Sequence, residues 1–291
     1  MSVAGRDDRG ADSFAREFSL EATRPSAADI ASLAGILKRG TQLYLSAVPS
    51  QSFEQHVEVA ATVRRAGLEP VAHLPARRFA STAELAGVLA RLRGEADLRR
   101  VLVVAGDAAT AGPYADTLAL IQGGKLRDAG IEEIGIAGYP EGHPTITADK
   151  LEAALDQKIA AARAAGLSVH IVSQFSFDPE AIVAWLVRLR KCGIAAPVKV
   201  GMAGPTSIPA LLRYAKRCGV GASLKGLMSG AASSLFGHVG PDRIVAALEA
   251  ARNEIGEAHP HYFSFGGVAE TARYAREKSE KAATADTVTA S

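Results

Sequence analysis

The feature that most constrains the fold is a regular alternation of short apolar segments with longer amphipathic segments. Several of the apolar segments are rich in Val, Ile and Leu without strict alternation, which is typical of parallel strands covered on both faces. The pattern predicts eight strands, over residues 17–21, 42–47, 70–74, 100–105, 133–139, 168–174, 197–202 and 262–265.

The segments between these strands have helical patterns with recognisable start signals. Glu84 follows Ser81 by three residues, the pattern of a capping box, and Asp178 stands as an N-cap before Pro179. The predicted helices span 28–39, 52–66, 81–93, 147–165, 179–191, 205–217, 241–255 and 268–281. Eight strand–helix units in about 260 residues predict an α/β protein, a (β/α)8 TIM barrel. An open doubly wound sheet is the alternative, but no Gly-x-Gly-x-x-Gly follows the first strand.

One barrel domain is expected to cover residues 14–278. The Gly- and Ser-rich stretch 219–240 belongs to no strand–helix unit, and we interpret it as extra helices before the last strand. The two ends, 1–13 and 279–291, consist of polar or small residues, and we expect them to be disordered tails.

Charge and composition exclude several classes of protein. The formal net charge is only +2, which gives no electrostatic basis for binding nucleic acid or an anionic membrane. The apolar runs are far shorter than the roughly 20 residues that span a bilayer, and residues 1–12 lack the apolar core of a secretory signal. Cys192 and Cys218 each precede a glycine at a predicted helix end, so we interpret them as structural thiols. No metal-ligand spacing of Cys and His occurs in the sequence. Because we interpret the two cysteines as structural thiols in a reducing compartment, we expect a cytoplasmic protein.

Polar residues gather where the predicted strands end. Active sites of such barrels lie at the carboxyl ends of the strands, so these residues are expected to share one mouth. They are Glu21, Ser46, His73, Asp107, Tyr139, His143 and Gln174. An unpaired polar group costs ~1–3 kcal/mol when it is buried. Their convergence on one concave surface therefore predicts a functional site.

Five short motifs at these strand ends resemble one known family. They are Phe-Ser-Leu-Glu (18–21), Ala-His-Leu (72–74), Gly-Asp (106–107), Tyr-Pro-Glu-Gly-His-Pro (139–144) and Ser-Gln-Phe-Ser-Phe-Asp (173–178). Their order resembles that of methylenetetrahydrofolate reductase, over roughly residues 15–270. The motifs at 139–144 and 173–178 are the most specific.

The resemblance implies a barrel that holds FAD at its strand ends. It also implies reduction of 5,10-methylenetetrahydrofolate to 5-methyltetrahydrofolate with NADH or NADPH, in an enzyme that can form homo-oligomers. By the same resemblance Glu21 is the general acid, which needs a raised pKa to donate a proton at neutral pH. Asp107 is the carboxylate beside the flavin ring. The implied substrate contacts are Gln174, Phe175 and Met202, and the implied cofactor contacts are Ser46, His73, Gly106, Asp107, Tyr114, Ala115, Tyr139, His143, Gln157 and Lys158.

Several positions depart from the family pattern and keep alternatives open. The arginine usual before Gly-Asp is Ala105, and the basic pair that faces phosphate is reduced to Gln157-Lys158. Ile208-Pro209, Phe263 and Gly267 also replace expected residues. These departures favour two alternatives: a reductase of the same fold without flavin, and a folate-binding protein without redox activity.

Individual residues have simpler interpretations as well. Glu21 could form an ion pair with Arg24 at the barrel mouth, and Asp107 could cap the helix that follows it. Lys158 could be a solvated helix residue, and His73 could be a core histidine with its hydrogen bonds satisfied.

Overall fold

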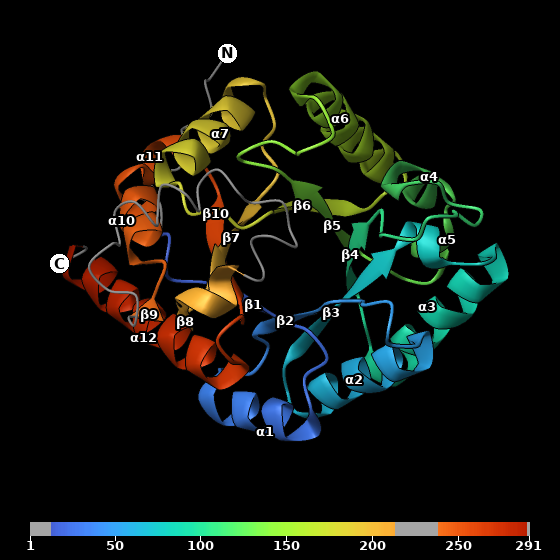
Figure 1. The fold of residues 1–291 in the computed structure, drawn as a ribbon, viewed down its shortest axis with the longest axis horizontal. Coiled ribbons are helices and arrows are strands. Elements are labelled where there is room, and N and C mark those ends of the chain that lie inside the picture. Colours follow the sequence, from blue (N-terminus) through green and yellow to red (C-terminus); the bar gives the residue numbers. More distant parts are fainter. Residues whose placement is uncertain (1–12, 213–237, 290–291) are drawn as a thin grey trace, which may run out of the picture.

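The computed structural model describes residues 13–212 and 238–289 and confirms a closed barrel of eight parallel strands (Figure 1). Each strand pairs with its neighbour in chain order, and the last strand closes the ring on the first. The barrel strands are β1 (Ser19–Ala22), β2 (Gln42–Leu45), β3 (Glu69–Pro75), β4 (Arg100–Val104), β5 (Glu133–Gly138), β6 (Ser168–Ser173), β7 (Val198–Ala203) and β10 (Ala258–Phe263).

Helices surround the barrel on the outside, as Figure 1 shows. They are α1 (Ala27–Ile36), α2 (Phe53–Arg65), α3 (Thr82–Ala96), α4 (Thr117–Gln122), α5 (Lys125–Asp128), α6 (Ala148–Ala164), α7 (Pro179–Lys191), α10 (Asp242–Ala250), α11 (Arg252–Ile255) and α12 (Val268–Thr289). A 3-10 turn, η1 (Ala76–Arg78), follows β3. A small antiparallel pair, β8 (Thr206–Ser207) and β9 (His238–Val239), lies outside the barrel.

Helix starts follow the sequence signals closely. Asp178 accepts a hydrogen bond from the Ala181 amide and begins α7. Ser81 accepts one from the Glu84 amide, but the Glu84 carboxylate accepts from the Ala80 amide at 2.6 Å, one residue before the N-cap. The predicted capping box is therefore only half formed.

Element boundaries differ from the predictions in three places. Strand β10 begins at Ala258, four residues before the predicted start at 262. Helix α12 continues to Thr289, and its Ser279 and Ala282 are buried, so the expectation of a disordered tail is wrong for 279–289. The segment predicted as one helix over 205–217 contains β8 instead near its start. Residues 1–12, 213–237 and 290–291 lie outside the described residues, and with them Cys218 and most of the predicted insertion.

The apolar core is divided between the outside and the inside of the barrel. Most buried apolar side chains lie between the strands and the surrounding helices. A separate small cluster joins Tyr44, Val71, Leu102 and Val172, which come from four different strands. Because alternate residues of a barrel strand face inward, these four side chains fill the interior. The remaining inward-facing positions are largely polar, among them Glu21, His170 and His261.

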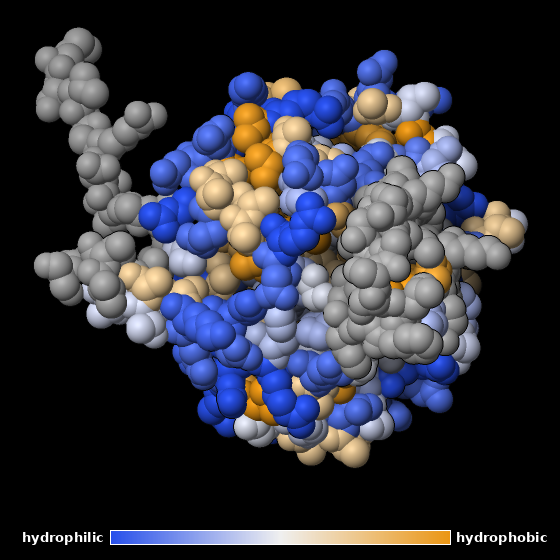
Figure 2. Space-filling model, turned by 60° about the vertical axis from the view of Figure 1, so that its left-hand side comes forward, coloured by the Kyte–Doolittle hydropathy of each residue, from blue (hydrophilic) through white to orange (hydrophobic). Residues whose placement is uncertain are grey.

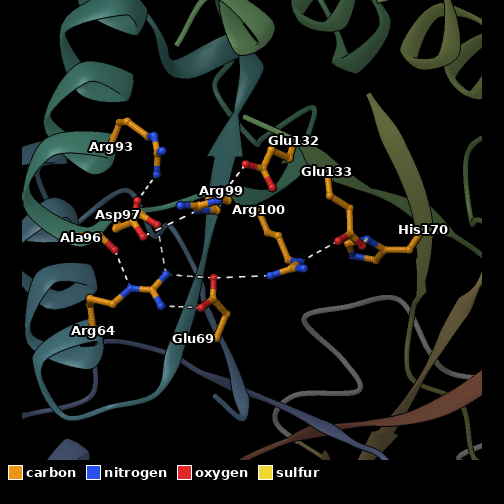
Figure 3. A network of polar contacts seen from close by, with 10 residues as sticks. All are labelled: Arg64, Glu69, Arg93, Ala96, Asp97, Arg99, Arg100, Glu132, Glu133 and His170. Carbon is orange, nitrogen blue, oxygen red and sulfur yellow. Dashed lines mark hydrogen bonds and ion pairs between the residues drawn. The ribbon is translucent and has the colours of Figure 1, made fainter. Parts of the chain in front are cut away.

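A network of ion pairs closes the end of the barrel where the strands begin (Figure 3). Arg100 donates to Glu133 at 2.6 Å and lies 3.6 Å from Glu69, which in turn pairs with Arg64. The other carboxylate oxygen of Glu133 lies 2.6 Å from His170 Nδ1. Since active sites of such barrels lie at the opposite end, this network serves stability rather than catalysis.

Figure 2 shows one face on which hydrophilic residues predominate, with smaller hydrophobic areas between them. Across residues 13–212 and 238–289, no helix has both the length and the apolar character needed to cross a membrane.

Replacing Gly135 with alanine tests whether the interior is packed as described. A Cβ at this position would lie 2.7 Å from His170 Nε2 and 2.9 Å from Leu102 Cδ1. We expect Gly135→Ala to lower the free energy of unfolding by ~1–3 kcal/mol, the usual cost of overpacking. Gly87→Ala is the matched control because nothing lies within 4 Å of its added Cβ on the exposed face of α3. Urea titration should find that control unchanged or stabilised by ~0.5–1 kcal/mol; equal effects of both variants contradict the packing.

Candidate active site

Glu21 stands at the carboxyl end of β1, and its side chain points into the barrel mouth. One carboxylate oxygen accepts a hydrogen bond from the Ser46 hydroxyl at 2.7 Å. The other lies 3.3 Å from Nε2 of His261 and 3.3 Å from Nε2 of His73. The structure thus brings together three predicted site residues, Glu21, Ser46 and His73, and adds His261. Arg24, the simpler partner considered from sequence, does not appear among these contacts of Glu21.

The pKa of Glu21 is set by two opposing influences. Burial raises the pKa, but the charge of His73 and the hydrogen bonds from His261 and His73 lower it more. The balance leaves the pKa of Glu21 well below its ordinary value of 4.5. The expectation of a raised pKa is therefore wrong for the protein without ligand. At neutral pH Glu21 is therefore a carboxylate.

His261 is a functional candidate that the sequence analysis missed. Its side chain is fully buried on β10, with Nδ1 2.9 Å from the Ser19 hydroxyl. Burial lowers the pKa of His261, and the hydrogen bond and negative charge of Glu21 raise it. The predicted strand began at Tyr262, so His261 was left outside it. The alternation of His259, His261 and Phe263 was the signal that places these side chains on one face.

The loop after β4 carries Gly106 and Asp107 to the same mouth. Gly106 has φ +84°, and a Cβ there would lie 2.9 Å from Pro75 Cβ, so glycine is required. Asp107 is exposed and does not cap the next helix, because the N-cap of α4 is Asp116. Two strands separate β1 from β4, which puts their ends roughly 14 Å apart along the barrel wall. Asp107 and Glu21 therefore face one mouth without direct contact.

A cavity of about 590 Å³ opens beside the ends of β4 and β5 and extends between α6 and α7. Three predicted cofactor residues line it: Tyr139, Gln157 and Lys158. Lys158 is partly buried, and burial lowers the pKa of its ammonium group while the nearby Asp116 raises it. At the floor, a Cβ on Gly138 would lie 2.7 Å from the Trp185 ring, so this glycine keeps the cavity open.

Three further predicted cofactor residues are not part of the cavity lining, namely Tyr114, Ala115 and His143. His143 packs edge-on against Tyr139, with ring centroids 5.3 Å apart, and accepts a hydrogen bond from the Thr145 amide. Tyr114 is buried, and Ala115 beside it is exposed. These contacts fit a role in shaping the loops.

Of the three predicted substrate residues, Met202 is misplaced. Its side chain is fully buried in the core between the strands and the outer helices, because 201 and 203 are the inward-facing positions of β7. We therefore withdraw Met202 as a substrate contact. The Gln174 side chain accepts a hydrogen bond from the Phe175 amide at 3.1 Å. Phe175 is 1% exposed and supports the mouth from beneath.

An aromatic wall, formed by Phe175, Phe263 and Phe265, stands next to Glu21. Phe263 pairs with Glu21 in the strand register, and its ring stacks on Phe265 with centroids 5.6 Å apart. Phe175 contacts both rings edge-on, at 5.6 Å and 5.1 Å. Partly exposed aromatic rings beside a carboxylate suit a flat ligand that carries hydrogen-bonding nitrogens.

Comparison of structures shows that this barrel is shared widely. A dihydropteroate synthase (FolP) from Thermus thermophilus is similar with a TM-score of 0.50 and 12% identity, over 92% of this chain and 93% of the other. A family 18 chitinase from Crocus vernus covers 92% of this chain and 98% of its own, with a TM-score of 0.47 and 11% identity. At 12% identity the likeness to the dihydropteroate synthase concerns the fold alone, and together with the closed ring of strands it places the chain among the (β/α)8-barrel proteins.

The family is shown by the sequence. The family described as Methylenetetrahydrofolate reductase matches residues 44–224, more than half of the chain. The chain therefore belongs to the methylenetetrahydrofolate reductase family. It is an oxidoreductase of that type, acting on a folate-linked one-carbon unit. The match includes His73, Gly106, Asp107, Tyr139 and Gln174.

The lowered pKa of Glu21 predicts a pH-dependent contribution to stability. A carboxyl group whose pKa is lower in the folded state stabilises the fold above its ordinary pKa of 4.5, and the contribution is lost as the pH falls. Glu21→Gln should therefore be less stable than the natural protein at pH 6, by ~1–3 kcal/mol. The difference should narrow towards pH 3 in urea titrations.

Glu95→Gln is the control for this experiment, since Glu95 is an exposed carboxylate paired with Arg91 on α3. The hydrogen bond with Arg91 also lowers the pKa of Glu95, but the pair is exposed and screened by water, so the stability difference of Glu95→Gln should change less than that of Glu21→Gln over the same pH range. A difference for Glu21→Gln that stays constant from pH 6 to pH 3 contradicts the lowered pKa.

Proposed function

We propose that this protein reduces 5,10-methylenetetrahydrofolate to 5-methyltetrahydrofolate, with FAD as the hydride carrier and NADH or NADPH as the reductant. The observation that carries the proposal is the carboxylate of Glu21, held by His73 and His261, at a mouth that opens beside a ligand-sized cavity. This arrangement pairs a proton-handling site with space for a redox cofactor.

The cavity has the size and some of the chemistry that a flavin nucleotide needs. Its volume of about 590 Å³ lies within the range of small-molecule and cofactor sites. Lys158 offers a positive charge for phosphate, and Tyr139 offers an aromatic edge at the end of β5. His73 and Asp107 stand at the strand ends between this cavity and Glu21. Bound flavin supplies the hydride, which no side chain can donate.

The residues around Glu21 handle the proton. Opening the methylene bridge needs a proton on one of the two nitrogens that hold it. The Glu21 carboxylate lies 3.3 Å from Nε2 of both His73 and His261. Folate binding would exclude water and raise the pKa of Glu21, which lets its carboxyl group donate. The cation that forms is stabilised by Asp107 across the mouth.

Glu21→Gln separates the proton step from hydride supply. The amide keeps the shape and hydrogen-bonding capacity of the side chain but cannot donate an acidic proton. We expect kcat for folate reduction to fall by ~10²–10⁴, while reduction of bound flavin by NADH or NADPH is nearly unchanged in stopped-flow measurements. Glu95→Gln should affect neither half-reaction. Folate reduction at the natural rate by Glu21→Gln would show that Glu21 is not the acid.

A second candidate function is favoured by the charges at the cavity. Four carboxylates line it, namely Asp116, Glu141, Glu152 and Asp156. Three cations face them, namely Lys150, Lys158 and Arg188, and Arg188 lies 3.4 Å from Glu152. With four carboxylates against three cations, the cavity attracts the negatively charged diphosphate of FAD only weakly. This weak attraction supports a reductase of the same fold in which the nicotinamide gives its hydride to the folate directly.

An absorbance spectrum and a lysine substitution distinguish these candidates. With flavin, the purified protein should be yellow and should bleach when NADH or NADPH is added without oxygen. Lys158→Met should then weaken FAD binding roughly tenfold, because a charge-assisted contact with phosphate is lost. Riboflavin, which has no phosphate, should bind as before in a fluorescence titration. Lys125→Met, on α5 outside the cavity lining, is the control.

The possible outcomes divide the candidates cleanly. A colourless preparation that reduces folate and gains nothing from added FAD favours the flavin-free reductase. Folate binding without turnover under any reductant favours a binding protein without redox activity.

A further inference from the structure

Tyr44 lies at the centre of the polar interior, and three histidines surround its ring. Its side chain is fully buried on β2, beside Glu21 in the strand register. The ring meets His261 edge-on with centroids 4.6 Å apart, and it meets His73 and His170 edge-on at 6.3 Å and 6.1 Å. Two of these three histidines are the ones that hold Glu21. The ring is therefore the packing surface behind both imidazoles.

The hydroxyl group of Tyr44 is anchored on the side away from Glu21. It lies 2.7 Å from His170 Nε2, and His170 Nδ1 lies 2.6 Å from Glu133. Glu133 is fixed in turn by Arg100 at 2.6 Å, within the network drawn in Figure 3. With the ring proton on Nδ1, beside the Glu133 carboxylate, Nε2 is the acceptor for the Tyr44 hydroxyl.

The arrangement has little freedom to relax. Gly135 opposes His170 so closely that an added Cβ would lie 2.7 Å from His170 Nε2. Tyr44, His170 and His261 are each at most 1% exposed. A buried tyrosine fixed at its hydroxyl cannot rotate without leaving His170 Nε2 unpaired, which costs the full desolvation of that group. The barrel floor thus determines where the Tyr44 ring stands.

We infer that Tyr44 is a positioning residue, which holds His73 and His261 against Glu21 by a ring that His170 and Glu133 anchor to the barrel floor. The inference rests on the proposed function, in which those two imidazoles hold the Glu21 carboxylate in place for the proton step. It concerns geometry at the site and needs no contact between Tyr44 and the substrate.

Several charged and titratable residues surround Tyr44 and its three histidines. Besides Glu21, Glu133 and Arg100, they are Lys199 on β7 and His56 on α2. Burial raises the pKa of Tyr44 well above 10, with Glu133 and Glu21 adding to the effect, so its hydroxyl stays protonated. Burial lowers the pKa of His170 despite its contact with Glu133. A protonated phenol facing a neutral imidazole is the state that the anchor requires.

Tyr44→Phe removes the anchor and keeps the ring. The freed ring lets the imidazoles move away from Glu21, so their contacts stabilise its carboxylate less. We expect the titration midpoint of Glu21, followed by ¹³C NMR of its carboxyl carbon in the full chain, to rise by roughly one pH unit. In folate reduction we expect kcat to fall roughly 10- to 100-fold with KM nearly unchanged, as misplaced catalytic groups give.

Tyr262→Phe is the matched control. Tyr262 is also buried, at 1% exposure on β10, but it faces the outer core, where it packs against Phe18 and Tyr274. Loss of its hydroxyl should leave both the Glu21 titration and kcat unchanged. Equal shifts in the two phenylalanine variants would mean that any buried hydroxyl loss disturbs the site, and would overturn the inference.

Two changes at His170 test the same anchor from its other side. His170→Gln can still accept from the Tyr44 hydroxyl and should preserve the Glu21 midpoint, whereas His170→Leu should raise it as Tyr44→Phe does. An unshifted midpoint in Tyr44→Phe and His170→Leu overturns the inference. The NMR titration needs neither folate nor cofactor. A failure of the proposed reaction therefore appears separately, as Glu21→Gln protein that still reduces folate.

Discussion

The pairing of the Glu21 carboxylate with two imidazoles is the interaction on which the site depends. A carboxylate in the interior of a barrel is costly unless opposite charge and hydrogen bonds surround it. His261 and Ser46 supply hydrogen bonds, at 3.3 Å and 2.7 Å, and His73 Nε2 lies 3.3 Å from the oxygen that His261 contacts. The same contacts that stabilise the carboxylate also hold it at the barrel mouth. Stability and chemistry therefore rest on one group of atoms.

That pairing is possible because the barrel interior is polar along much of its length. In barrels of this type, layers of branched apolar residues commonly fill the centre. Here the apolar part of the barrel interior consists of a few side chains around Val71 and Leu102. Tyr44 packs against both these side chains and the polar residues. Glycine at 135 gives His170 its space. The ion pairs of Glu133 and Arg100 then close the floor of the barrel, so the polar side chains of the interior are held in place at that end.

The fold was predictable from the sequence because covered parallel strands leave strong apolar signals. A site residue was predictable only where the sequence showed which face of its strand the residue occupies. His261 was missed because polar residues fill the start of β10, so the apolar signal began four residues late. Met202 was assigned to the wrong face for a related reason, since a shift of one residue in a strand reverses every side chain. The pKa of Glu21 depends on partners up to 240 residues away in sequence, which no local pattern contains.

The closed ring of strands separates two regions of the barrel mouth, one around Glu21 and one beside the cavity. Glu21, His261 and Phe263 stand where the first and last strands meet, because closure makes β1 and β10 neighbours. The cofactor-sized cavity lies on the β4 and β5 side, where α6 and α7 border it. His73, on β3, lies between the two regions and touches Glu21. Because the strands follow chain order from β1 to β5, the ring of strands itself sets this order of Glu21, His73 and cavity along the mouth.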